Sequence, residues 1–220
     1  MPLERAKWVR IVSPKTFEVE AYGTLSGRLE GLYIGPYPLT YGQGFIIYAY
    51  VRNTGDIPAY FEIEARALGV TRKGGKWLDP GKADWIYAVF DSGVWRGYRS
   101  GTRPSIDITI RYGYLRERKL LATKTVTCDV AWADLHFGAS HRKAPICTHV
   151  DWVARIVHKG GGNPTYGLKV VVKDPTGKVV ASTRDIEARR EWSARVHMSV
   201  RGKYVGTAEA YVYRGILKVV

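Results

Sequence analysis

The chain has 220 residues, of which 45% are hydrophobic, and it includes seven Trp and fifteen Tyr. This much apolar and aromatic surface favours collapse, which excludes a disordered chain. Lys and Arg exceed Asp and Glu by 34 to 20, a net charge of +14 that attracts nucleic acid, anionic lipid or acidic protein surfaces. The longest basic runs are only pairs such as Arg189-Arg190. A basic, solvated surface therefore explains the charge better than a concentrated phosphate-binding stripe.

The amino-terminal stretch MPLERAKWVRIVSPKTFEVEAYG carries several early charges and lacks an apolar run long enough for a signal peptide. No segment approaches the length of a transmembrane helix. We therefore expect a soluble protein without a membrane span, located in the cytoplasm or in a virion, or a mature form whose leader is missing.

Alternation of apolar and polar residues with period two dominates the chain and predicts β-strands. Gly, Pro, Asn and Asp clusters separate the alternating runs, as turn chemistry requires. The predicted strands are 45–53, 60–68, 105–114, 168–174, 178–183 and 207–214. The stretch 185–196 comes nearest to a helical pattern and is predicted to be a loop that leads into a strand.

One turn occurs twice: VRNTGDIPAY (Val51 to Tyr60) and VHKGGGNPTY (Val157 to Tyr166) match without a gap at an offset of 106 residues. This offset suits a whole small domain rather than a solenoid repeat. Each copy continues to an acidic residue followed by Trp85 or Trp192, and both Trp are predicted to lie in a core. The apolar phase after the turn differs by one residue, which predicts a bulge or a longer turn in one copy.

Short strands at regular spacing predict an all-β protein of two tandem immunoglobulin-like antiparallel β-sandwich domains, residues 1–128 and 129–220. The pattern of NTGD, LDPGKADW (Leu78 to Trp85) and SGTRPSIDITI resembles the CARDB-type immunoglobulin-like domains of archaeal and bacterial surface proteins. The resemblance covers roughly Phe45 to Tyr114 and, more loosely, Val150 to Tyr213. It implies a binding or scaffolding module without catalytic residues. The Gly-rich and Pro-rich segment Ala21 to Gly44 predicts an added hairpin or arm.

Both cysteines and three of the five histidines fall within 22 residues: Cys128, His136, His141, Cys147 and His149. Thiolate and imidazole are zinc ligands, but the Cys-x-x-Cys spacing of a zinc knuckle is missing, so no metal is expected. A disulfide between Cys128 and Cys147 and two free thiols are both compatible with the sequence. Few Met, Cys and Gln beside many Arg, Tyr and Val hint at a thermophilic source, in which intracellular disulfides do occur.

Motifs that carry catalysis are missing, among them the Gly-x-Ser-x-Gly elbow, the Walker loop and His-Glu-x-x-His. The Gly-rich run Lys159 to Pro164 precedes a strand rather than a helix, so a hairpin turn explains it better than a phosphate cradle. The carboxylates of Glu62, Glu64, Asp107 and Glu209 alternate along strands and indicate a solvated face. We expect no enzymatic activity and no cofactor.

Aromatic and basic residues interleave in GVWRGYRSGTR, Gly93 to Arg103. Such a pattern suits single-stranded nucleic acid or a protein interface, and one loop is a small footprint for nucleic acid. We therefore predict an interface, with its aromatic residues outside the core. Its candidate residues are Trp95, Arg96, Tyr98, Arg99 and Arg103 from this loop, with Tyr33, Tyr37 and Tyr41 from the arm. The alternative is that the arm folds back onto its own sandwich.

These features predict a non-enzymatic structural or interaction protein that binds other protein subunits, with a homo-oligomer as one form. A structural component of the virion of an archaeal or thermophilic virus is the assembly that we expect. The alternative is a nucleic-acid-binding module that uses the basic surface.

Overall fold

The computed structural model describes residues 23–114, 116–187 and 191–220, and most of its regular structure is β-strand. The strands are β1 (Gly27–Tyr37), β2 (Leu39–Thr40), β3 (Phe45–Asn53), β4 (Ala59–Ala67), β5 (Val70–Leu78), β6 (Ala83–Phe90), β7 (Ser105–Gly113), β8 (Lys119–Thr127), β9 (Val130–Ala131), β10 (Ala133–Ala139), β11 (His149–His158), β12 (Tyr166–Lys173), β13 (Val179–Glu187), β14 (Glu191–Ser199), β15 (Val205–Val212) and β16 (Gly215–Lys218). The helical part of the described chain is the 3-10 helix η1 (Ser92–Gly97). The predicted all-β class is confirmed.

The six predicted strands correspond to β3, β4, β7, β12, β13 and β15, with ends that differ by a few residues. The stretch 185–196 behaves differently from the loop that we predicted. It contains the end of β13 and the start of β14, with residues 188–190 outside the described part.

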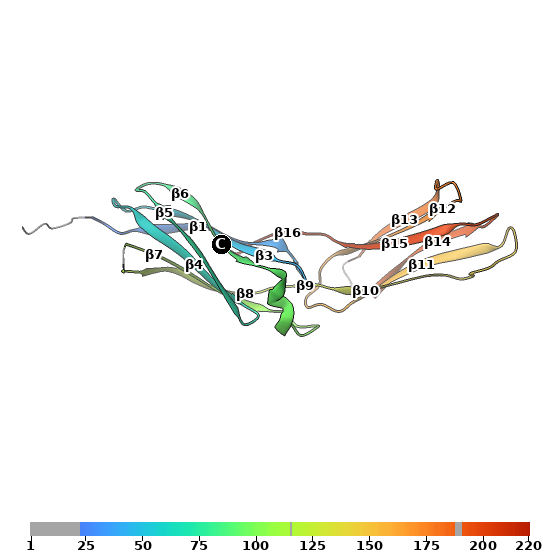
Figure 1. The fold of residues 1–220 in the computed structure, drawn as a ribbon, viewed down its shortest axis with the longest axis horizontal. Coiled ribbons are helices and arrows are strands. Elements are labelled where there is room, and N and C mark those ends of the chain that lie inside the picture. Colours follow the sequence, from blue (N-terminus) through green and yellow to red (C-terminus); the bar gives the residue numbers. More distant parts are fainter. Residues whose placement is uncertain (1–22, 115, 188–190) are drawn as a thin grey trace, which may run out of the picture.

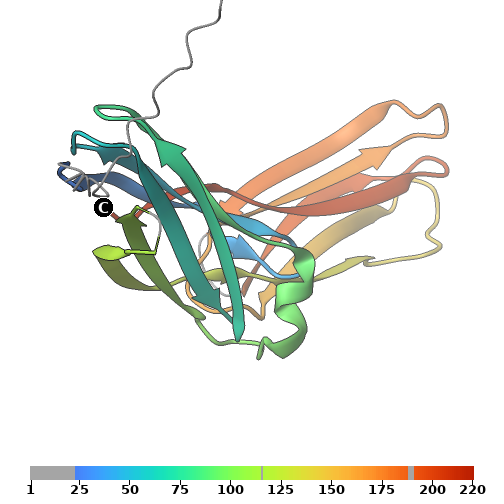
Figure 2. The same ribbon diagram turned by 60° about the vertical axis from the view of Figure 1, so that its left-hand side comes forward.

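The N-terminal sandwich consists of two four-stranded sheets, in the orders β16-β1-β3-β6 and β5-β4-β7-β8. All the pairings within these sheets are antiparallel. The two sheets form the layers in the left half of Figure 1, and Figure 2 shows them from another side. Alternate residues of each strand meet between the layers, where Leu32, Ile47, Phe61, Ile86 and Ile108 are buried. The strand periodicity therefore places the core as the sequence predicted.

The C-terminal sandwich consists of two three-stranded sheets, in the orders β10-β11-β14 and β13-β12-β15. Its core is smaller and includes Ile156, Leu168, Val170, Val172 and Ala194, all fully buried. The two sandwiches lie end to end along the long axis of the molecule (Figure 1).

The repeated turn makes the same contacts in both sandwiches. The amide of Thr54 donates to the carbonyl of Ser26 over 3.1 Å, and 106 residues later the amide of Gly160 donates to the carbonyl of Trp132 over 3.0 Å. A Cβ on Gly55 or on Gly161 would lie about 2 Å from a neighbouring carbonyl oxygen, so both positions need glycine. In each sandwich the turn therefore binds the residue that comes directly before the first strand, Ser26 before β1 and Trp132 before β10.

Each copy of the turn joins the two sheets of its own sandwich. The first copy leads from β3 to β4, and the second leads from β11 to β12, and in each case the two strands lie in different sheets. The prediction of a hairpin turn at Lys159 to Pro164 is therefore wrong. The turn spans residues 54–58 in the first copy and 159–165 in the second. This longer turn explains the phase difference, since Phe61 and Leu168 are both buried.

The last strand, β16, returns to the N-terminal sandwich. It pairs with β1 through Tyr33↔Lys218 and Ile34↔Leu217, and the amide of Val219 donates to the carbonyl of Leu32 over 2.7 Å. By sequence β16 lies within residues 129–220, yet it adds to a sheet of the N-terminal sandwich. The expected division at residue 128 did not include this return.

Candidate interaction surfaces

The outer face of the β16-β1-β3-β6 sheet carries a group of half-buried and exposed aromatic residues. The register of β3 and β6 brings Tyr48 opposite Tyr87 and Tyr50 opposite Trp85, and β1 adds Tyr33 opposite Tyr48. Flanking apolar side chains lie on the same face. We call this surface the aromatic face: Tyr33, Ile46, Tyr48, Tyr50, Trp85, Tyr87, Val89 and Ile216.

The rings of the aromatic face contact one another. The Trp85 ring centroid lies 4.9 Å from that of Tyr50 and 5.6 Å from those of Tyr48 and Tyr33. Even so, Trp85 is 42% exposed and Tyr87 is 57% exposed. Contiguous exposed apolar surface of this kind marks interaction sites in soluble proteins.

The prediction that Trp85 lies in the core is wrong. On β6, Ile86, Ala88 and Phe90 point inward, so Trp85 and Tyr87 point outward by strand alternation. Asp84 and Trp85 lie at the start of the strand, as predicted, but the first buried residue of the strand is the next one, Ile86. The side chain of Trp192, its counterpart, lies outside the described residues.

Two cations at the rim of the aromatic face are paired with carboxylates. Arg52 contacts Glu30 over 2.6 Å, and Lys76 contacts Asp84. A hydrogen bond from Arg52 lowers the pKa of Glu30, and one from Lys76 lowers the pKa of Asp84. Both carboxylates are therefore charged at neutral pH and offset the neighbouring positive charge.

A hollow of about 530 Å³ adjoins the aromatic face where β5 passes beside β6, lined in part by Lys73, Trp85 and Tyr87. A Cβ on Gly74 would lie 2.0 Å from the carbonyl oxygen of Tyr87. Glycine is therefore required for the two backbones to approach this closely.

The loop that was predicted to be an interface, Gly93 to Arg103, packs in part against the core of its own chain. Trp95 is only 4% exposed, its ring contacts those of Tyr41 and Tyr98, and its Nε1 donates to the carbonyl of Gln43 over 2.7 Å. The expectation that the loop's aromatic residues stay outside the core is wrong for Trp95. The Asp91 side chain accepts from the amide of Gly93 over 2.8 Å, which starts η1 and turns Trp95 inward.

Three of the other predicted residues, Tyr37, Tyr41 and Arg103, lie where the two sandwiches of one chain meet. The Tyr41 ring stacks on Trp132 at 5.0 Å, and β2 pairs with β9 in parallel. The Tyr37 hydroxyl accepts from the amide of Asp129 over 3.2 Å, and Arg103 contacts the same Asp129 over 3.0 Å. Burial is the main cause of the raised pKa of Tyr37.

A residue of the same loop outside the predicted set also lies at the junction, whereas Arg96, Arg99 and Tyr33 of the set lie at the surface. The Ser100 hydroxyl donates to the carbonyl of Lys159 over 2.8 Å, which ties the loop to the second sandwich. Arg96 and Arg99 are exposed, and Tyr33 belongs to the aromatic face. The segment from residue 23 to Gly44 forms β1 and β2, so it folds back onto its own sandwich, which was the alternative prediction.

The cysteines do not pair with each other. Cys128 is buried in the N-terminal core, and Cys147 is exposed in the loop between β10 and β11. Burial raises the pKa of the Cys128 thiol to about 12. The disulfide alternative is therefore wrong in this structure, and both thiols are free.

Only Cys147 is expected to react with a thiol reagent in the folded protein. At pH 8 the raised pKa keeps Cys128 protonated, and burial blocks access to it. Titration should give one reactive thiol per folded chain and two after unfolding. Cys147→Ser should remove the fast reaction, whereas Cys128→Ser should keep it. Two equally fast thiols in the folded protein would contradict this expectation.

The Cys and His residues that the sequence analysis weighed as metal ligands do not gather. His136 and His141 are exposed, and His149 stacks on His197, which contacts Asp151 over 2.8 Å. Within residues 23–114, 116–187 and 191–220, no three His, Cys, Asp or Glu side chains could hold a metal ion.

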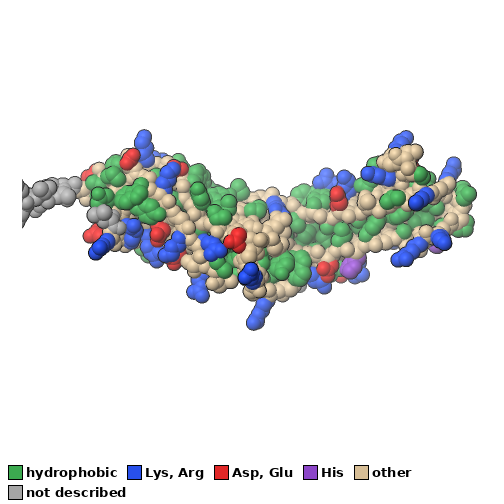
Figure 3. All heavy atoms as spheres, viewed as in Figure 1, with side chains coloured by type: hydrophobic (Ala, Val, Ile, Leu, Met, Phe, Trp, Pro, Cys, Tyr) green, Lys and Arg blue, Asp and Glu red, His purple; other side chains and the backbone are tan. Residues whose placement is uncertain are grey.

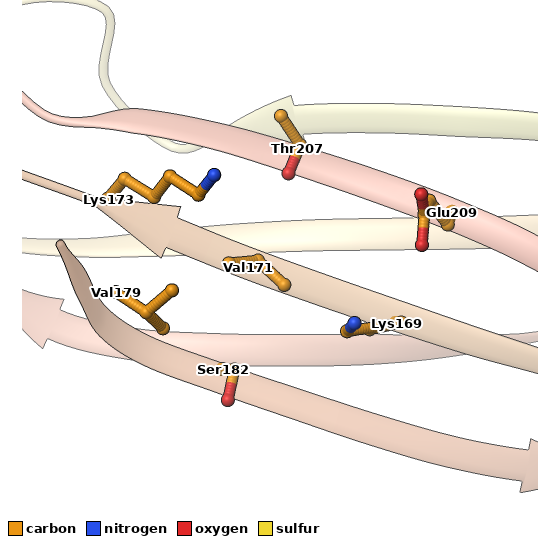
Figure 4. Close-up of a pocket in the computed structure, with 7 residues that line it drawn as sticks. All are labelled: Lys169, Val171, Lys173, Val179, Ser182, Thr207 and Glu209. Carbon is orange, nitrogen blue, oxygen red and sulfur yellow. The ribbon is translucent and has the colours of Figure 1, made fainter. Parts of the chain in front are cut away.

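The outer face of the β13-β12-β15 sheet has a shallow hollow of about 430 Å³, shown in Figure 4. Lys169 and Glu209 lie opposite each other there in register, with Val171, Ser182 and Thr207 around them. Glu209 is exposed on this face, as the sequence predicted. The mixture of single charges and small side chains offers a solvated surface.

Sequence reasoning missed Tyr48, Tyr50 and Tyr87 as surface residues. The usable signal was the aromatic residue at every second position of β3 and β6, on the side opposite the buried Ile47 and Ile86. When aliphatic and aromatic residues alternate along a strand, both faces are apolar, and the sequence does not show which face is buried.

In the described part of the chain, no helix is long and apolar enough to cross a membrane. No protein-family model matches the sequence, and no curated protein matches it. Among solved structures, a red sea bream transglutaminase is similar over 88% of this chain, with 12% identity and a TM-score of 0.34. This chain spans 31% of that protein, and a likeness this weak carries no argument about function. The resemblance to CARDB-type domains stays a prediction.

Proposed function

We propose that the protein is a non-enzymatic structural subunit of a larger protein assembly, and that the aromatic face binds a neighbouring subunit. The observation that supports this proposal is the group of Tyr rings in contact with the exposed Trp85 on the outer face of one sheet, with the exposed Tyr87 beside them. Tyr and Trp supply large contact area at low entropic cost and dominate the energetics of interfaces. A virion stays the proposed setting, from the sequence argument alone.

A nucleic-acid-binding module is the second reading, and the charges around the aromatic face favour it less. Phosphate binding needs cations that release counterions, whereas Arg52 and Lys76 already contact carboxylates. A salt titration of DNA and RNA binding separates the readings. Affinity that persists at physiological salt and falls steeply above it would favour nucleic acid.

Replacing Trp85 and Tyr87 together by Ser is expected to weaken association of the full chain about 30-fold or more, since an interface anchor contributes about 2 kcal/mol. Both side chains are exposed, so the fold should persist. The measurement is sedimentation velocity over a range of protein concentrations, with native mass spectrometry of the species formed.

The matched control replaces Trp77 and Tyr114, an exposed aromatic pair with ring centroids 5.7 Å apart, by Ser. This pair lies away from the aromatic face, so association should match that of the wild type. If both double variants associate like the wild type, the aromatic face is not an interface.

A further inference from the structure

The described C-terminal sandwich has two strands fewer than the N-terminal sandwich, because it has no counterpart of β16 or of β8. In sheet order, β10, β11, β12, β13, β14 and β15 correspond to β1, β3, β4, β5, β6 and β7. In the N-terminal sandwich β8 then pairs with β7 from Ser105↔Thr127 to Tyr112↔Lys119. Among the described residues no strand pairs with the equivalent side of β15, because the next strand, β16, pairs with β1. The edge of β15 is open.

The inward side chains next to this open edge are small. On β7 the inward residues Ile106, Ile108 and Ile110 are fully buried, or nearly so. On β15 the inward positions are Gly206, Ala208 and Ala210, and Ala210 is exposed although it lies opposite the buried Leu168. Large side chains that fill the N-terminal core are missing here, which leaves room for side chains from another strand.

The facing strand shows the same deficit. Leu135 and Phe137 of β10 lie opposite the buried Ile156 and Ala154, so they face inward, yet each is 38% exposed. In the N-terminal sandwich β8 contacts β1 across the core, and the inward Leu32 and Ile34 of β1 are fully buried. A strand beside β15 would cover Leu135 and Phe137 in the same way.

Two hollows follow this open side. One of about 190 Å³ is lined in part by Ala133, Ala210 and Val212, and one of about 380 Å³ by Trp152 and Tyr204 together with basic side chains. The indole Nε1 of Trp152 is buried and finds no hydrogen-bond partner among the described residues. Figure 3 shows hydrophobic side chains along the middle of the C-terminal half, with charged side chains along its margins. We call the region between β10 and β15 the strand slot.

We propose that the strand slot binds residues 13–21 of a second copy of this chain as an added β-strand. The repeat offset of 106 residues maps β8, residues 119–127, onto residues 13–21. Residues 13–21 precede the N-terminal sandwich in the chain just as β8 precedes the C-terminal sandwich. β8 does not join the sandwich that follows it but pairs with β7 of the N-terminal sandwich, the one before it. By the same logic, residues 13–21 complete the C-terminal sandwich of a neighbouring copy.

The sequence of this segment suits such a strand. Phe17, Val19 and Ala21 alternate with polar residues, so their side chains share one face of an extended chain. Phe17 and Val19 would supply the bulk that Ala208 and Ala210 lack. At an offset of 106 residues, Phe17, Val19 and Ala21 fall one residue away from the inward positions of β8. The same shift of one residue separates β4 from β12, so the offset alone does not fix the register of the added strand.

Direction and charge agree with a second copy as the donor. An added strand antiparallel to β15 runs away from the N-terminal sandwich, so residue 21 would lie at the far tip of the C-terminal sandwich. The described chain begins, in blue, at the end of the N-terminal sandwich that points away from that tip (Figure 1), which places the donor's body beyond it. Glu18 and Glu20 would then lie near the basic residues that line the tip hollow, Arg142, Lys143 and Lys203.

This contact is head-to-tail, and head-to-tail contacts build open filaments when the rotation does not close. The inference deepens the proposed function, on which it rests, by naming a second copy as one partner. It uses a different surface from the aromatic face, so the two can fail separately.

The test uses a full-length chain with Phe17→Asp and Val19→Asp, which disables the donor segment and leaves the strand slot intact. This variant should lose the head-to-tail species that the wild type forms, and any association that remains should be through the aromatic face. A labelled peptide of residues 12–23 should bind the variant one to one, measured by fluorescence anisotropy and native mass spectrometry. A control peptide with residues 17 and 18, and 19 and 20, exchanged keeps the composition but reverses the faces. It should bind at least ten-fold more weakly.

Two slot variants in this background locate the site. Ala210→Arg fills the slot and should weaken peptide binding at least ten-fold, whereas Thr207→Arg, on the outer face of β15, should leave it unchanged. The Trp85→Ser, Tyr87→Ser change should also leave peptide binding intact, which separates this test from that of the aromatic face. Equal binding of both peptides, no peptide binding, or wild-type association by the donor variant would overturn the proposal. So would a strictly monomeric wild type whose own segment blocks the peptide.

Discussion

Replacing Trp95 by Ala is expected to lower the free energy of unfolding by about 3 to 5 kcal/mol, the usual cost of removing a buried Trp. Trp95 is 4% exposed, packs against Phe45 and Tyr98, and donates its indole hydrogen to the carbonyl of Gln43. The change would leave a cavity at the base of the N-terminal core and remove the partner of a carbonyl. Equilibrium urea unfolding followed by far-ultraviolet circular dichroism measures the loss.

The matched control is Trp77→Ala. Trp77 is about half exposed on β5 and contacts Tyr60 and Tyr114 at the surface, so the expected loss is only about 1 to 2 kcal/mol. A loss below about 1 kcal/mol for Trp95→Ala, or equal losses for the two variants, would show that Trp95 is not a core residue.

Periodicity predicted the fold class and most strands because the inner face of a sandwich excludes polar side chains. Strands β3 and β4 show this, since Ile47, Val51 and Ile63 are buried while their neighbours are not. The same rule failed at β6, where both faces are apolar and aromatic. From Trp85 onward no polar residue marks the outer face of this strand, so the sequence could not show whether Trp85 points inward or outward.

Strand pairing was the second limit, because alternation identifies a strand but not the edge that it joins. The short β16 segment could pair with β15 as a hairpin or continue to β1, and tertiary packing decides between them. The loop from Gly93 to Arg103 shows a third limit. Its Trp, Tyr and Arg residues suit an interface, and they do form one, between two sandwiches of the same chain.

Replacing Asn53 by Asp is expected to cost about 3 to 5 kcal/mol at neutral pH, because it places an unpaired charge in a buried site. Asn53 is fully buried, and its Nδ2 donates to the carbonyls of Ile57 and Leu78 over 2.8 and 2.9 Å. Its Oδ1 accepts from the amide of Gly55 over 3.0 Å. A carboxylate would keep the last contact but would face two carbonyl oxygens.

The loss should depend on pH. Burial and the two carbonyls disfavour the charged carboxyl, so its pKa in the folded variant lies above that in the unfolded chain, about 3.9. The charge-dependent part of the loss is therefore absent below about pH 3.9, grows as pH rises to the folded pKa, and is constant above it. One lost amide hydrogen bond remains at every pH. Asn163→Asp, an exposed position in the second copy of the turn, is the control and should change stability little. Urea unfolding of both variants between pH 4 and pH 8 provides the measurement, and a pH-independent loss for Asn53→Asp would mean that water or a rearranged turn solvates the new carboxylate.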